Sequence, residues 1–80
     1  MHASGQRKIN MGYHDYLDLT EEFKCEDFPV AGLNDSGERV IIDKYDGDES
    51  YFKVTTYQNN DWIRINYFYK DGSVDEIYER

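Results

Sequence analysis

Histidine and cysteine, the residues best suited to acid–base and thiol chemistry near neutral pH, are few in this 80-residue sequence: two histidines and one cysteine. His14 stands beside Asp15, a combination that can act as a general base with its orienting carboxylate. Adjacent residues rarely face each other, however, and no nucleophile accompanies this pair. Cys25, the only cysteine, is followed by Glu26 and Asp27, whose negative charges disfavour a reactive thiolate. We therefore interpret His14 as a surface histidine and Cys25 as an unreactive thiol, and we expect no enzymatic activity.

Carboxylates are most concentrated around residue 46, where Asp43, Asp46, Asp48 and Glu49 follow one another closely. Their oxygens are ligands that a hard cation prefers, but the spacing does not follow the calcium-binding loop of an EF-hand. The two histidines and the single cysteine lie too far apart to form a zinc site by spacing. The sequence also has no glycine-rich phosphate loop. We expect a solvated turn here, with no metal and no other cofactor.

The elements that would position these residues are easiest to identify after residue 30. Turn-forming residues occur at 34–37, 46–49, 59–60 and 71–72, and runs rich in β-branched and aromatic residues separate them. Four successive hairpins predict an antiparallel meander of about five strands over residues 30–80. We therefore predict one α+β or mostly β domain over residues 11–80. Its sheet is either open or curled into a small barrel, and a flexible tail over residues 1–10 precedes it.

Residues 13–24 allow two interpretations. Tyr13, Tyr16, Leu17 and Phe23 fall near one helical face, which predicts a short N-terminal helix. Alternatively, residues 16–19 form a short strand, and Thr20 caps the turn that follows. We favour the helix.

A two-residue turn at 59–60 predicts which side chains share a face of the sheet. The resulting pairs are Tyr57 with Trp62, Thr56 with Ile63, Val54 with Ile65 and Phe52 with Tyr67; a second turn at 71–72 adds Tyr69 with Val74 and Arg64 with Glu79. The predicted core face then consists of Phe52, Val54, Ile63, Ile65, Tyr67 and Tyr69. The other face carries Tyr51, Lys53, Tyr57, Trp62, Arg64 and Phe68. This second face is covered by the N-terminal segment, enclosed by a barrel, or in contact with a partner.

Negative charge is the clearest feature of the composition. The net charge is −8, and residues 15–49 hold 12 acidic side chains against three basic ones. Direct binding to nucleic acid requires the opposite sign, and an anionic membrane surface would repel this chain. Trp62, Tyr57, Phe68 and Arg64 are residue types that stack on bases, but we interpret them as packing residues because of this charge. The absence of an apolar signal region in residues 1–10, together with a single cysteine, predicts a cytoplasmic protein.

The acidic half suggests a binding role. Carboxylates on a compact sheet can imitate the charge spacing of a nucleic-acid backbone and so select a basic partner. We assign the contact to Asp46, Asp48 and Glu49 in one turn and to Glu26 and Asp27 before Pro29. The simpler alternative is that the acidity only keeps a small protein soluble.

In size, acidity, aromatic-rich meander and lack of a catalytic motif, the whole chain resembles the small inhibitors that phages carry against host defence. These inhibitors include anti-CRISPR proteins and DNA mimics. The resemblance implies an inhibitor that docks on the basic nucleic-acid-binding surface of a partner protein. An alternative function is structural: an assembly protein, such as a homodimer, built through the aromatic sheet face or a strand edge.

Overall fold

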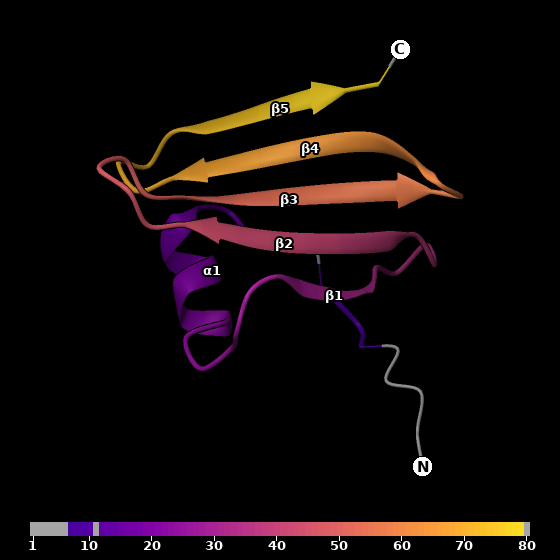
Figure 1. Cartoon of the computed structure of the whole chain (residues 1–80), viewed down its shortest axis with the longest axis horizontal. Coiled ribbons are helices and arrows are strands. Elements are labelled where there is room, and N and C mark those ends of the chain that lie inside the picture. The colour runs from indigo at the N-terminus through magenta and orange to yellow at the C-terminus, as the bar shows by residue number, and fades with distance from the viewer. Residues whose placement is uncertain (1–6, 11, 80) are drawn as a thin grey trace.

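The computed structural model describes residues 7–10 and 12–79 as one helix followed by five strands. The elements are α1 (Tyr16–Glu22), β1 (Val30–Leu33), β2 (Arg39–Tyr45), β3 (Tyr51–Gln58), β4 (Asp61–Tyr69) and β5 (Val74–Tyr78). The strands form a single antiparallel sheet in the order β1-β2-β3-β4-β5, and α1 lies against one of its faces (Figure 1). The predicted meander with a short N-terminal helix is confirmed, and the sheet is open, not closed into a barrel.

The helix begins where its sequence provides a cap. Asp15 is the N-cap residue, and its side chain accepts a hydrogen bond from the Asp18 N–H at 3.1 Å, which satisfies a backbone donor that the first turn leaves free. Residues 16–19 are therefore helical and not a strand. Leu19 is fully buried, whereas Leu17, which the helical pattern placed on the packed face, is 72% exposed. In the described part of the chain, no helix is long and apolar enough to cross a membrane.

The core lies between α1 and the face of the sheet that α1 covers. Phe52 on β3 is at its centre, with ring centroids 5.1 Å from Tyr16 and 5.7 Å from Phe28. The buried apolar residues are Ile9, Leu19, Phe23, Val30, Val40, Ile42, Phe52, Val54 and Phe68. Such a core is small, as expected for 80 residues, so each of its large side chains contributes substantially to stability.

Residues 7–9 run beside the outer edge of β1. The Ile9 N–H donates to the Leu33 carbonyl at 2.7 Å, and the Leu33 N–H donates to the Arg7 carbonyl at 2.7 Å. Gly32 permits this approach, because a Cβ at that position would collide with the Arg7 carbonyl and the Ile9 side chain. Ile9 is only 1% exposed. The packed part of the chain therefore includes residues 7–9, although the sequence predicted a tail over residues 1–10; residues 1–6 lie outside the described part.

A β-bulge changes the predicted register between β3 and β4. Tyr57 lies opposite Trp62, as predicted, but Thr56 lies opposite Arg64, so β4 contains one extra residue, Ile63. Beyond the bulge, Phe52 pairs with Phe68 and Val54 with Asn66; on the next strand, Phe68 pairs with Val74 and Arg64 with Tyr78. The predicted pairs of Thr56, Val54 and Phe52 were therefore wrong by one residue. The predicted pairs of Val74 and Glu79 were also wrong by one residue, because the Tyr69 N–H donates to the Ser73 carbonyl and the β4–β5 turn thus has three residues, 70–72, in place of two. A shift of one residue moves every side chain to the opposite face.

The bulge reverses the two faces of β4. Arg64, Asn66 and Phe68 point to the helix side, whereas Ile63, Ile65, Tyr67 and Tyr69 point to the other side, which we call the open face. Phe52 and Val54 were correctly predicted as core residues. The prediction for Ile63, Ile65, Tyr67 and Tyr69 was wrong, because turn signals do not reveal an extra residue inside a strand.

Truncating one isoleucine on each face tests this arrangement. Ile42, on the helix side, is fully buried, so Ile42→Ala should lower the free energy of unfolding by about 2–5 kcal/mol. Ile65→Ala, on the open face, should cost clearly less, because its side chain already contacts solvent. Urea unfolding of the two variants gives both values. Equal losses would mean that the open face is covered in solution.

Candidate binding surface at the acidic end of the sheet

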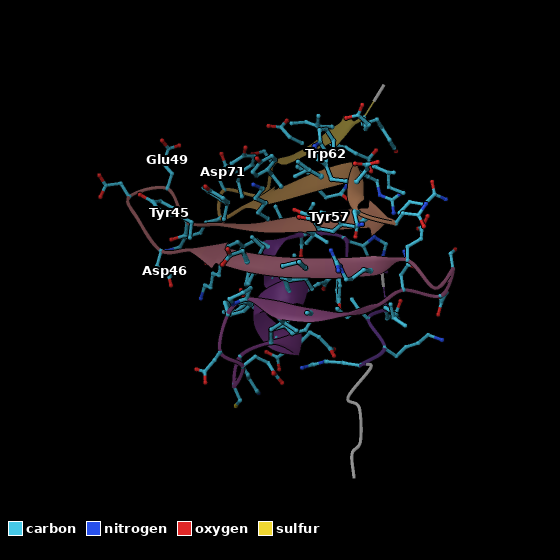
Figure 2. All side chains as sticks on the ribbon, turned by 45° about the vertical axis from the view of Figure 1, so that its right-hand side comes forward. Tyr45, Asp46, Glu49, Tyr57, Trp62 and Asp71 are labelled. Carbon is cyan, nitrogen blue, oxygen red and sulfur yellow. The ribbon has the colours of Figure 1, made fainter. Side chains whose placement is uncertain are left out.

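The meander brings two turns to the same end of the sheet. The β2–β3 turn holds Asp46, Asp48 and Glu49, and the β4–β5 turn holds Asp71; all four are exposed. The two turns are joined by a hydrogen bond from the Lys70 N–H to the Ser50 carbonyl at 3.0 Å. Figure 2 shows Asp46, Glu49 and Asp71 projecting from this end. We call these four carboxylates the acidic end. Asp71 was absent from the predicted site, although alternate turns of any meander fall at the same end.

Two carboxylates of the acidic end, Asp71 and Asp46, interact with polar groups in their own turn or strand. Asp71 accepts hydrogen bonds from the hydroxyl and the N–H of Ser73, at 2.6 and 2.8 Å, and these bonds hold the pKa of Asp71 below its usual value. Asp46 lies 3.4 Å from the Lys44 ammonium group but stays 71% exposed. Such an exposed ion pair is weak and exchangeable. The acidic end therefore keeps negative charge that is exposed to solvent.

The other two predicted contact residues lie elsewhere. Glu26 and Asp27 are exposed in the loop that leads into the edge strand β1. Glu26 forms an ion pair with Arg7 at 2.9 Å, and the Arg7 guanidinium lies 5.3 Å from the centre of the Phe23 ring. The structure therefore gathers Asp46, Asp48 and Glu49 but leaves Glu26 in a local ion pair on the helix side.

Four tyrosines lie on the open face directly beside the acidic end. Tyr45 stacks on Tyr51 at 5.2 Å between ring centroids, and Tyr67 stacks on Tyr69 at 6.0 Å. Tyr51 joins the two pairs with edge contacts at 5.6 and 5.7 Å. A Cβ at Gly47 would collide with the Tyr45 ring, so the glycine lets this ring lie over the acidic turn. We call these four tyrosines the tyrosine cluster. Sequence reasoning missed it because the bulge decides where Tyr67 and Tyr69 point.

The surroundings of the tyrosine cluster raise the pKa of one of its members, Tyr69. Desolvation raises its pKa above the usual value of 10.0, and the nearby carboxylate of Asp75 and the other rings raise it further. Asp75 lies opposite Tyr67, on the same face. The Tyr69 hydroxyl therefore remains a neutral hydrogen-bond donor and acceptor well above neutral pH.

The open face continues along the strands beyond the tyrosine cluster. It carries Ile41, Thr55, Ile63, Ile65 and Ile77. At the end farther from the acidic turns lie Tyr57 and Trp62 (Figure 2), with the Arg39 guanidinium 5.0 Å from the Tyr57 ring centre. In the described part of the chain, α1 lies behind the sheet and no helix or strand covers this face (Figure 1). Most of these side chains are half-buried, and Ile77 is 45% exposed. Apolar and aromatic side chains gathered on one accessible face are typical of an interaction surface.

A cleft of about 440 Å³ lies on the helix side, between residues 13–14 and the strands β4 and β5. In its wall, Glu76 accepts hydrogen bonds from the Asn66 amide and the Tyr78 hydroxyl, both at 2.7 Å. These bonds, the one from Tyr78 first, lower the pKa of Glu76. Arg64 also lines the cleft and lies 3.4 Å from the Thr56 hydroxyl.

The other described residues that the sequence suggested for acid–base catalysis, base stacking or metal binding do not form a common site. Asp15 caps the helix and so does not orient His14, and Cys25 is exposed. Arg64 and Phe68 lie on the face opposite to Tyr57 and Trp62, so these four residues do not form one base-stacking platform. Within residues 7–10 and 12–79, no three His, Cys, Asp or Glu side chains form a group that could hold a metal ion.

Comparisons with protein-family models, with curated proteins and with solved structures find no match for this chain.

The position of Asp75 beside the tyrosine cluster can be tested by titration. Asp75→Asn removes a negative charge that opposes the Tyr69 phenolate, so the pKa of Tyr69 should fall toward 10.0. Asp71→Asn serves as the control, because Asp71 does not contribute to this shift. NMR titration of the Tyr69 ring carbon measures both variants. Equal shifts in the two variants would contradict the placement of Asp75.

Proposed function

We propose that this chain is a small binding protein whose acidic end and open face dock on a basic nucleic-acid-binding surface of a partner protein. It would block that surface, in the manner of the anti-CRISPR and DNA-mimic inhibitors that it resembles. The observation that carries the proposal is the contact between the tyrosine cluster and the acidic turns, because it joins charge and aromatic area in one surface.

Such a surface suits lysine and arginine side chains. Carboxylates accept charge-assisted hydrogen bonds from them, and tyrosine rings attract the same cations over their faces. Tyrosine also contributes large contact area at a low cost in conformational entropy, as it does in antibody paratopes. A partner arginine near Tyr45 could therefore stack on the ring and reach the carboxylate of Asp46 or Glu49.

The charge of the chain supports a protein partner over nucleic acid. With a net charge of −8, the molecule repels phosphate backbones but speeds association with basic proteins. A binding role, and not catalysis, also suits a chain in which Asp15 caps the helix and so does not orient His14, and in which Cys25 is an exposed thiol. We place its action in the cytoplasm, where nucleic-acid-binding effectors with basic grooves occur.

The open face favours one alternative, self-assembly. Two copies could bury the accessible parts of the isoleucines and tyrosines on this face against each other. Light scattering at increasing protein concentration distinguishes this alternative, because a dimer would double the mass. Such a dimer would also withstand added salt, whereas docking through the acidic end would weaken as salt screens exposed charges.

Neutralising the acidic end tests the proposed docking. A partner is first captured from a nuclease-treated lysate and identified. The triple variant Asp46→Asn, Asp48→Asn and Glu49→Gln should then bind it at least about tenfold more weakly at low salt. DNA or RNA should compete with the unaltered chain for the partner.

The matched control neutralises three exposed acids on α1 and the β1–β2 turn, outside the acidic end and the open face: Glu21→Gln, Glu22→Gln and Asp35→Asn. It changes the net charge by the same amount and should bind nearly as tightly as the unaltered chain. If both triple variants bind equally, or if nucleic acid does not compete, the proposed docking is wrong.

A further inference from the structure

The two edge strands of the sheet, β1 and β5, differ in whether another segment pairs with their outer side. The outer edge of β1 is occupied by residues 7–9 through two backbone hydrogen bonds. β5 is the other edge (Figure 1), and among the described residues no segment pairs with its outer side. Every residue of β5 is exposed, including Val74 at 44%, Ile77 at 45% and Tyr78 at 59%. An edge strand of this kind is a template for an added strand.

The hydrogen-bond pattern shows which backbone groups of β5 are available. The Ser73 carbonyl accepts from the Tyr69 N–H, and the Glu79 N–H donates to the Ile63 carbonyl. Paired residues of an antiparallel ladder alternate between bonded and non-bonded positions. The backbone groups of the odd-numbered residues of β5 therefore face β4, and the N–H and C=O groups of Val74, Glu76 and Tyr78 face outward.

The charged residues of β5 indicate which kind of strand can pair with its outer edge. Asp75 and Glu76 are adjacent, so their side chains lie on opposite faces of β5, and residues 74–79 contain no basic side chain. Pairing with β5 of a second copy would bring these acids together, and like charges on paired strands are destabilising. A strand with adjacent lysines or arginines flanked by apolar residues would instead place a cation beside each acid and an apolar side chain beside Val74 and Ile77.

The cleft beside β5 provides space for side chains of such a strand. It lies on the same side as the side chains of Val74 and Glu76, which line it. Side chains that an added strand places on this side would extend past the edge of β5 toward Tyr13 and His14. The ordered carboxylate of Glu76, held by Asn66 and Tyr78, would meet a basic side chain there.

From these observations we infer that β5 accepts an extended basic segment of a partner protein as a sixth strand of the sheet. This site differs from the acidic end and does not depend on docking there. Main-chain hydrogen bonds would contribute affinity, and the two acids would select basic sequences.

The probe for this site is the acetylated and amidated peptide Thr-Val-Lys-Lys-Val-Thr, added to the full ¹⁵N-labelled chain. At saturation it should slow the amide hydrogen exchange of Val74, Glu76 and Tyr78 by at least about tenfold. A second peptide with the same sequence and charge, but with methyl groups on its backbone nitrogens, cannot donate to the ladder and should give no such protection. The triple variant of the acidic end should retain the protection of the three amides.

Two double variants distinguish strand pairing at β5 from nonspecific electrostatic attraction of the peptide. Asp75→Asn with Glu76→Gln should weaken peptide binding severalfold, while the control Asp46→Asn with Asp48→Asn removes the same charge and should have a smaller effect. If the methylated peptide binds as well, or if the three amides stay unprotected, β5 is not a strand-addition site, and its acids only prevent pairing. Protection that appears without peptide and grows with protein concentration would mean that a second copy is the occupant, which would overturn the inference.

Discussion

The open face and the cleft beside β5 both follow from the β-bulge opposite Tyr57. One extra residue, Ile63, shifts the register of β4 against β3, so that Asn66 and Phe68 face the helix in place of Ile65 and Tyr67. The helix side of β4 thereby becomes partly polar, and a cleft remains between β4, β5 and the segment before α1. The open face gains the isoleucines and tyrosines that an unbroken register would have buried. A single insertion thus exchanges a conventional core face for a surface suited to binding.

The core on the helix side is built mainly on β1 to β3, so the fold accommodates polar side chains on the same side of β4. A seven-residue helix can cover only part of a five-stranded sheet, and its contacts concentrate on β3, where Tyr16 packs on Phe52 and Leu19 is buried. Ile9 and Phe28 complete the core near β1 and β3. The helix itself makes few contacts with β4 and β5, and the polar side chains Asn66 and Glu76 of these strands bond to each other. The geometry of the helix layer therefore explains why the cleft lies beside the open edge of the sheet.

The meander topology then places charge and aromatic area together. Because alternate turns fall at the same end, two acids from different hairpins, Glu49 in the first turn and Asp71 in the second, share one surface. The hydrogen bond between Lys70 and Ser50 joins these turns, and the tyrosine cluster lies directly beside them. Carboxylates at such an edge attract cations over a distance, while the rings provide contact area at short range. Neither group alone would distinguish a basic protein surface from other partners.

The strands, the turns and the short helix were predictable from the sequence, because these elements depend on local preferences. Asn59 adopts a positive φ of 59° in the predicted two-residue turn, and Asp15 caps the helix just before its first residue. Three features emerged only in the folded chain: the buried face of β4, the cover of the β1 edge by residues 7–9, and the place of Asp71 beside the other acidic turn. They depend on pairing between distant segments, where one extra residue such as Ile63 has no local signature but reverses every side chain beyond it.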